Sequence, residues 1–124
     1  MTDQALARRA AACSGWRWVP GMLDTDGWRI GDVTLHDGAR EAVRRGVLRL
    51  YHYPRLPDLT DHATLGCLLA LVREAWGMPT GITVAYSDDT GRWVVSWSGA
   101  THGGVCGEGI TEGEALVMAL ENAP

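Results

Sequence analysis

Hydrophobic and polar residues follow a helical period most clearly in the stretch "PDLTDHATLGCLLALVREAWG", which begins at residue 57. Its large apolar residues recur at helical spacing and form one stripe, which consists of Leu65, Leu68, Leu69, Val72 and Trp76. Asp61 is a favourable N-cap residue, and Gly77 follows the last apolar residue. The pattern therefore predicts a helix from about His62 to Trp76 whose stripe belongs to the hydrophobic core rather than to a binding surface.

A period of two replaces the helical period in "GITVAYSDDTGRWVVSWSG". Alternate residues of two runs are apolar and are expected to share one face of a sheet: Ile82, Val84 and Tyr86, then Trp93, Val95 and Trp97. The turn-forming residues 88–91 ("DDTG") separate the runs, so the stretch predicts a β-hairpin. The following "HGGVCGEG" is expected to add a short third strand.

The segment "TEGEALVMALENA" predicts a closing helix from about Glu112 to Asn122, because Thr111 and Glu114 have the spacing of a capping box. The residues expected to face inward are Leu116, Ala119 and Leu120. Residues 57–124 thus have the order α-β-β-β-α. We predict a two-layer sandwich in which the helix stripe packs on the sheet face that carries Trp93 to Trp97.

In the first part of the chain, turn-forming residues separate shorter segments. Residues 3 to 13 are rich in alanine and predict a short helix that ends at Ser14-Gly15. Asp26-Gly27, Asp37-Gly38 and Gly46 then separate short segments such as "WRWV", "WRIGDVTL" and "VLRLYHY", which predict a β-meander of three or four strands. Residues 40–45 could form a helical turn instead. The predicted class is α+β, with an N-terminal helix and meander (1–56) and a sandwich (57–124) in one compact unit.

Composition narrows the class of protein. A chain of 124 residues with 46% hydrophobic residues suits one globular domain, and no apolar run approaches the roughly 20 residues that a membrane span needs. The first residues lack the basic start and long apolar segment of a secretory signal. We therefore expect a cytoplasmic protein with no membrane partner. Cys13, Cys67 and Cys106 are widely spaced and are expected to be free thiols.

Charge is distributed unevenly along the chain. All basic residues are arginine; nine of them stand against seven acids in residues 1–60, whereas residues 61–124 have two against eight. The acidic second part repels phosphate, which argues against a nucleic-acid partner. Only "REAVRRGVLR", with Arg40, Arg44, Arg45 and Arg49, could form a basic patch, and the favoured interpretation is a solvated strand face.

Candidate chemistry is sparse. The histidines are isolated and lack the spacing of a metal site; they are His36, His52, His62 and His102. Cys106 and His102 could act as nucleophile and base, but a buried structural cysteine is the favoured interpretation. "GGVCGEG" lacks the lysine of a phosphate-binding loop, and the pair Asp88 and Asp89 is explained by turn formation. We expect a non-enzymatic protein without catalytic residues, metal or cofactor.

Two family resemblances rest on these segments. The block "LPDLTDHATLGCLLALVREAWG", the strands after it and "TEGEALVMALENAP" resemble the phage ABA sandwich domain, an α-β-β-β-α domain of bacteriophage and prophage accessory proteins. This resemblance covers about residues 57–124 and implies phage or prophage origin, without implying any catalytic residue. The segment "GVCGEGITEGEAL" is similar to the strand-to-helix signature of HicB-like antitoxins.

The resemblances lead to a functional hypothesis. We expect a phage or prophage accessory protein that binds a bacterial host protein or protein complex, and an inhibitor of a host defence system, such as an anti-CRISPR protein, fits its size and charge. The alternative is a HicB-like antitoxin that neutralises a small toxin. A hydrolase or nuclease whose site is assembled only by the fold is the remaining class.

Tryptophan suggests where a partner would bind. The chain has six tryptophans and no phenylalanine, and tryptophan and arginine are enriched at interface hot spots. Trp76, Trp93 and Trp97 belong to the predicted sandwich, which leaves the three tryptophans of the meander. The predicted contact residues are Trp16, Arg17, Trp18, Trp28 and Arg29. The alternative is that these three rings form the meander's own small core.

Overall fold

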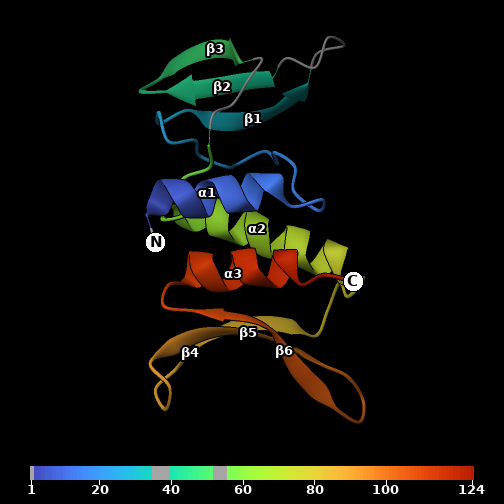
Figure 1. The fold of residues 1–124 in the computed structure, drawn as a ribbon. Helices are drawn as coiled ribbons and strands as arrows, with labels where there is room; N and C mark the ends of the chain where they lie inside the picture. The colour runs from blue at the N-terminus through green and yellow to red at the C-terminus, as the bar shows by residue number, and fades with distance from the viewer. Residues whose placement is uncertain (1, 35–39, 52–55) are drawn as a thin grey trace.

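The computed structural model describes residues 2–34, 40–51 and 56–124. Over these ranges the chain forms three helices and two three-stranded antiparallel sheets, which is the predicted α+β class (Figure 1). The helices are α1 (Asp3–Ala12), α2 (His62–Ala75) and α3 (Glu112–Glu121). The strands of the first sheet are β1 (Arg29–Thr34), β2 (Arg40–Arg44) and β3 (Val47–Tyr51), and those of the second are β4 (Ile82–Ser87), β5 (Arg92–Ser98) and β6 (Gly103–Gly109).

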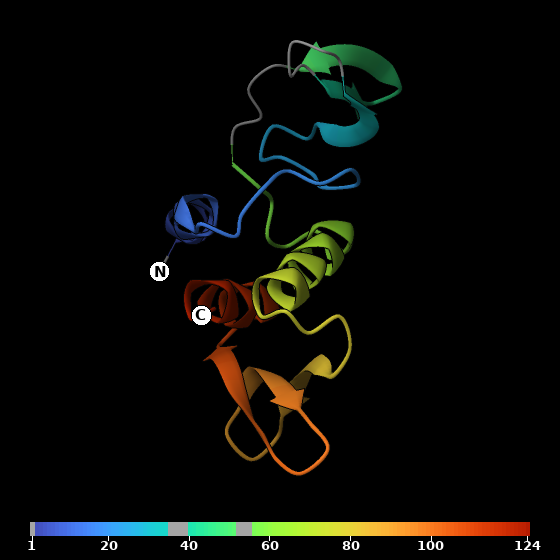
Figure 2. The same cartoon turned by 90° about the vertical axis from the view of Figure 1, so that its right-hand side faces the viewer.

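The helices lie between the two sheets. Both views place the β1–β3 sheet at one end of the molecule and the β4–β6 sheet at the other, with α2 and α3 side by side in the middle (Figures 1 and 2). α1 joins this helical layer by packing on α3, where Ala7 and Ala10 are buried and Arg9 pairs with Glu121. No helix in the described ranges is both long and apolar enough to cross a membrane.

The predicted helix starts are confirmed by their caps. The Asp61 side chain accepts a hydrogen bond from the Thr64 backbone N–H at 3.0 Å, and Thr111 accepts one from the Glu114 N–H at 3.1 Å. Thr2 caps α1 in the same way. Each bond satisfies one of the backbone donors that a helix leaves unpaired in its first turn, which is why these residue types mark the starts.

The predicted hairpin and third strand at the C-terminal end are confirmed, but the helix that contacts all three strands is α3, and α2, whose stripe was expected on this sheet, packs on α3 instead. β4 and β5 pair without a register shift, so that Ile82 lies opposite Trp97 and Val84 opposite Val95. The predicted apolar residues of both strands therefore share one face, and Ile82 and Val95 on that face are completely buried. The face is covered by α3, which contacts all three strands.

Glycine lets α3 approach β6 closely. A Cβ at Gly107 would lie 2.5 Å from the Ala119 backbone nitrogen and 2.6 Å from the Ala115 carbonyl oxygen. The pairing of β5 with β6 also shifts register between Val95 and Ser96, as at a β-bulge. The glycines of "GGVCGEG" thus lie in a strand, where Gly107 has a packing role.

The buried side of α2 is wider than the predicted stripe. Leu65, Leu68 and Val72 are buried as expected, whereas Leu69 and Trp76 are only partly buried against the core. Thr64 and Leu71, which are outside the stripe, are also buried. They lie two turns apart on one side of the helix, and Thr64 accepts a hydrogen bond from the Leu23 N–H. The stripe prediction missed this side because a segment distant in sequence covers it.

The N-terminal meander has three strands. Residues 40–44 form a strand rather than a helical turn, and "WRWV" is not a strand. Arg45 (φ 51°) and Gly46 (φ 79°) form the tight turn between β2 and β3, and positive φ at both residues matches the right-handed twist of the strands. The predicted Asp26-Gly27 turn is confirmed by a hydrogen bond from the Gly27 N–H to the Asp24 carbonyl. The predicted turn at Asp37-Gly38 lies outside the described residues.

Candidate functional site

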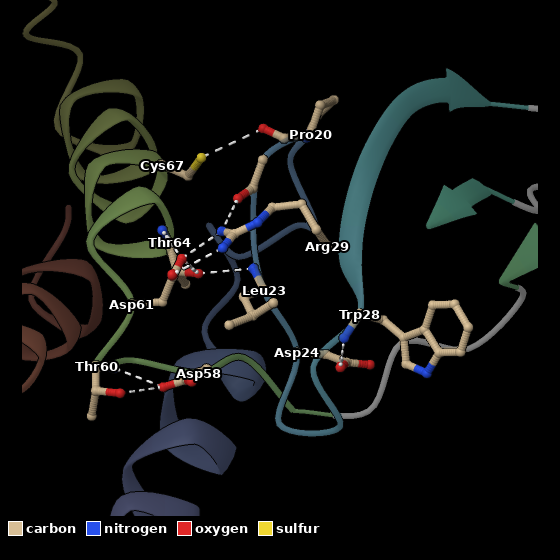
Figure 3. A network of polar contacts seen from close by, with 11 residues as sticks. Pro20, Leu23, Asp24, Trp28, Arg29, Asp58, Thr60, Asp61, Thr64 and Cys67 are labelled. Atoms are coloured by element: carbon tan, nitrogen blue, oxygen red, sulfur yellow. Dashed lines mark hydrogen bonds and ion pairs between the residues drawn. The ribbon is translucent and has the colours of Figure 1, made fainter. Parts of the chain in front are cut away.

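The first sheet is attached to α2 by a polar network (Figure 3). The Arg29 guanidinium donates two hydrogen bonds to the Asp61 carboxylate, at 2.7 and 3.1 Å, and a third to the Gly21 carbonyl. Thr64 links the same carboxylate to the Leu23 backbone. The residue that caps α2 therefore also holds the start of β1, so one carboxylate fixes both the helix and the sheet.

The electrostatics of this network follow from the ion pair. The hydrogen bond from Arg29 lowers the pKa of Asp61 to about 2, and the hydrogen bonds from Thr64 act in the same direction, against the opposing effect of burial. The Asp61 side chain is 17% exposed, so solvent screens this pair less than a pair fully in water. The carboxylate is therefore charged at neutral pH and keeps its structural bonds there.

A buried aspartate shapes the turn before β1. Asp24 is 1% exposed, and its carboxylate accepts a hydrogen bond from the Trp28 backbone N–H at 2.8 Å (Figure 3). It accepts a second from the Asp26 N–H at 2.9 Å. The turn fixes Trp28, whose ring is covered from the hairpin side by two arginines. The guanidinium carbons of Arg44 and Arg49 lie 4.5 and 5.5 Å from the ring centroid, within the range of cation–π contacts.

The β2–β3 hairpin extends away from this anchor. In both views β3 is the strand of its sheet that lies farthest from the helices (Figures 1 and 2). The hairpin exposes Val43, Val47 and Leu48, with exposed fractions of 40%, 61% and 60%. Val43 and Leu48 are cross-strand neighbours and share one face, while Val47 lies opposite Arg44 on the other face. Both faces of the hairpin therefore present apolar side chains to solvent.

A groove at the base of the hairpin adds charge to this apolar surface. It has a volume of about 490 Å³ and is lined by Asp26, Gly27, Trp28, Arg44, Arg45 and Val47. Arg44, Arg45 and Arg49 are all exposed. We call the exposed residues Val43, Arg44, Arg45, Val47, Leu48 and Arg49 the hairpin surface. Guanidinium groups beside apolar side chains suit a protein surface in which carboxylates surround an apolar centre.

The five predicted contact residues do not form one patch. Trp28 is 4% exposed, so its ring is not available to a partner, and Arg29 bonds to Asp61 at the start of α2. Arg17 pairs with Glu74 near the opposite end of α2, about 20 Å away at 1.5 Å per residue. These two arginines are thus anchored at opposite ends of one helix.

The other two predicted rings form a separate pair. Trp16 and Trp18 make an edge-to-face contact with centroids 5.6 Å apart, and both are partly buried against the core. Within the described residues, then, neither a three-ring core of the meander nor a three-ring surface exists: Trp28 is buried at one place, and the other two rings are half-exposed at another.

The candidate catalytic residues lie apart as well. Cys106 is 1% exposed and burial raises the pKa of its thiol, whereas His102 is exposed and its ring stacks edge-on against Trp97. Asp88 and Asp89 are exposed in the β4–β5 turn, as predicted. In the part of the chain that is described, no three His, Cys, Asp or Glu side chains are grouped to hold a metal ion. His36 and His52 are outside that part.

Sequence reasoning found the arginines of the hairpin surface but missed its apolar residues. The segment "REAVRRGVLR" was interpreted as a solvated basic face, and its valine and leucine residues were not considered as part of a contact surface. The available signal was the pattern itself, because the paired strands place Arg44 on one face and Glu41 on the other, so that neither face is fully apolar.

Comparison of the chain with models of protein families, with curated proteins and with solved structures found no match. The resemblances to the phage ABA sandwich domain and to HicB-like antitoxins therefore stay predictions from the sequence.

Proposed function

We propose that this protein is a phage or prophage accessory protein that acts without catalysis by binding a protein of the bacterial host, and that the hairpin surface is its contact site. The observation that supports this proposal is the exposure of three large apolar side chains beside three arginines on a hairpin that extends from the body. Exposed apolar clusters with a charged rim are typical of protein contact sites. The partner surface has an apolar centre surrounded by carboxylates.

Inhibition of a host defence system, in the manner of an anti-CRISPR protein, is the biological role we infer for this binding. It follows from the resemblance to a phage domain together with the small size and acidic balance of the chain. The alternative role is a HicB-like antitoxin. The direct succession of β6 (Gly103–Gly109) and α3 (Glu112–Glu121) supports it, because this strand-to-helix unit carries the similar signature.

Affinity capture from host lysate tests the contact site. Three baits are compared: the unchanged chain, the double variant Val47→Asp with Leu48→Asp, and the control Val105→Asp, which changes an equally exposed valine on β6. The proposal expects a host protein that the first and third baits retain and the double variant loses, with affinity reduced at least about tenfold and the melting temperature unchanged. Equal capture by all three baits would refute the hairpin surface as the site.

Two further comparisons identify the role. Expression of the chain in a host with an active defence system should raise phage plating efficiency, and the hairpin double variant should not. Rescue of growth during expression of a captured small toxin would instead support the antitoxin. Loss of capture by Trp18→Ala, with the hairpin double variant unaffected, would move the contact site to the tryptophan pair predicted from the sequence.

A further inference from the structure

The β4 strand is an open edge of the second sheet. The strand order β4-β5-β6 leaves β4 paired on one side only among the described strands. The Ser98 N–H donates to the Gly81 carbonyl at 2.9 Å, which makes this the hydrogen-bonded type of pair. Because bonded and non-bonded pairs alternate along an antiparallel ladder, the backbone N–H and C=O groups of Ile82, Val84 and Tyr86 point away from β5.

An arginine already occupies the start of this edge. The Arg73 side chain donates from Nε and Nη2 to the Ile82 carbonyl oxygen, at 3.3 and 3.0 Å. A guanidinium in this place blocks the edge at Ile82. The outward-pointing backbone groups of Val84 and Tyr86 are left for a further strand, and the Tyr86 side chain is 52% exposed.

The rest of β4 lacks the features that usually protect an edge strand. Its sequence "ITVAYS" contains no charge, proline or glycine, and its register with β5 is uninterrupted. The opposite edge, β6, is protected by several glycines, by Glu108 and by a register shift. Uncharged, regular edges pair with other strands, whereas bulged and charged edges resist pairing.

We propose that β4 pairs antiparallel with β4 of a second copy of this chain, about a two-fold axis at Ala85. In this register Val84 of each copy lies opposite the partner's Tyr86, and each such pair exchanges two backbone hydrogen bonds. The pairing uses the groups that Arg73 leaves free. The pairing joins the β4–β6 sheets of the two copies into one continuous sheet. The resulting interface is isologous, the commonest kind in homodimers.

Charge complementarity favours a second copy over an unrelated strand. The same register places Ile82 opposite the partner's Asp88, and residues opposite each other in an antiparallel pair point to the same face. The face of Ile82 is the one toward the helices, from which Arg73 reaches the edge. The exposed Asp88, which directly follows β4, then lies near the start of the partner's β4, where Arg73 reaches the edge.

Sedimentation velocity tests the proposal on the unchanged chain and on four variants, from about 1 µM to about 1 mM. The unchanged chain should associate to a dimer. Ala85→Lys brings two ammonium groups together at the axis, and Tyr86→Pro removes an N–H that bonds nothing within the single chain. Each should weaken dimerisation at least about tenfold. Asp88→Lys should weaken it less, and Val105→Lys on the opposite edge should leave it unchanged.

Circular dichroism melting of the same variants separates a lost interface from a lost fold, because Ala85 and Tyr86 are exposed in the single chain. A monomer at about 1 mM would overturn the proposal. Dimerisation that survives both Ala85→Lys and Tyr86→Pro, or that only Val105→Lys abolishes, would equally overturn it. Protection of β4 amides by a host protein, with the free chain monomeric, would assign the edge to that protein and refute self-pairing.

Discussion

The two sheets of this chain have the same meander topology but differ in how they meet the core. The β4–β6 sheet lies face-on against α3 and buries Ile82, Val95 and Cys106. The β1–β3 sheet buries Ile30 and Ala42, next to its attachment, and exposes the apolar residues of its outer hairpin. Strand pairing alone thus does not make a core. A sheet contributes one only where another layer covers its face.

The difference is already present in the side-chain pattern of the paired strands. In β4 and β5 the apolar residues of both strands are in phase and share one face, which α3 covers. In β2 and β3, Arg44 shares a face with Val47 while Val43 shares the other with Leu48. The first face cannot be buried without burying Arg44, and the second cannot be buried without burying Glu41. Burial of either charge is costly unless the charge is paired.

Identical leucine truncations in the two regions should have the most different effects. Leu68→Ala removes a fully buried side chain of α2 and should reduce the free energy of unfolding by about 2 to 5 kcal/mol. Leu48→Ala, on the exposed hairpin, should reduce it by less than about 0.5 kcal/mol. Leu69→Ala should fall between them, since Leu69 is half-buried. Urea denaturation measures all three, and equal losses would contradict the comparison.

Alanine at two glycines tests the close packing of the C-terminal sandwich. Gly107→Ala places a Cβ against the backbone of α3 and should cost about 1 to 3 kcal/mol or more. Gly66→Ala, in α2 with no atom within 4 Å of the added Cβ, should stabilise the chain by up to about 1 kcal/mol. Thermal melting compares the pair; tolerance of Gly107→Ala would mean that α3 does not lie directly on β6.

The attachment of the first sheet should depend on acid. The pKa of Asp61 is lowered to about 2 in the folded chain, below the value of about 3.9 expected when unfolded. Its stabilising contribution is therefore fully present above about pH 4 and is lost as the pH falls toward 2. Arg29 is 42% exposed, so we expect a contribution on the order of 1 kcal/mol after screening.

Asp61→Asn provides the control for this acid dependence. The variant should be less stable than the unchanged chain at neutral pH, and the difference should shrink between about pH 4 and pH 2. Urea denaturation across this range measures it. A difference that stays constant with pH would show that the charge of Asp61 does not hold the sheet.

The smallest effect is expected at the other end of α2. The ion pair between Arg17 and Glu74 has side chains that are 55% and 60% exposed, and solvent screens such pairs strongly. Arg17→Ala should leave the denaturation midpoint unchanged within error. A clear loss would show that the "WRWV" segment is held on α2 by this pair and not by the partly buried Trp16 and Trp18.

Local patterns were sufficient for the elements of the sandwich, although not for which helix lies on the sheet. The caps Asp61 and Thr111, the in-phase strands and the closing helix each depend on neighbouring residues, and all were predicted near their observed positions. The second buried side of α2 was not predictable, because the burial of Thr64 and Leu71 depends on tertiary contacts, such as the hydrogen bond between Thr64 and Leu23, 41 positions earlier. The sequence shows periodicity within an element but not which distant element will lie on it.

The candidate site was only partly predictable for a related reason. Tryptophan and arginine composition indicated the N-terminal meander, but burial of Trp28 beneath Arg44 and the pairing of Arg29 with Asp61 depend on tertiary contacts. Val47 and Leu48 are exposed, although their residue types predict burial, since apolar residues in a strand are normally interpreted as core. The exposure of these two side chains depends on the position of the hairpin relative to the helices, which the sequence pattern does not show.

Native-state hydrogen exchange of the isolated chain tests the contrast between the two sheets most directly. The account predicts that bonded amides of β5 exchange only through global unfolding, while those of β2 and β3 exchange through a local opening of much lower free energy. Leu68→Ala should then accelerate exchange in β5 while leaving exchange in β2 and β3 nearly unchanged. Equal opening free energies in the two sheets would contradict the account, because the hairpin would then be part of the same cooperative core.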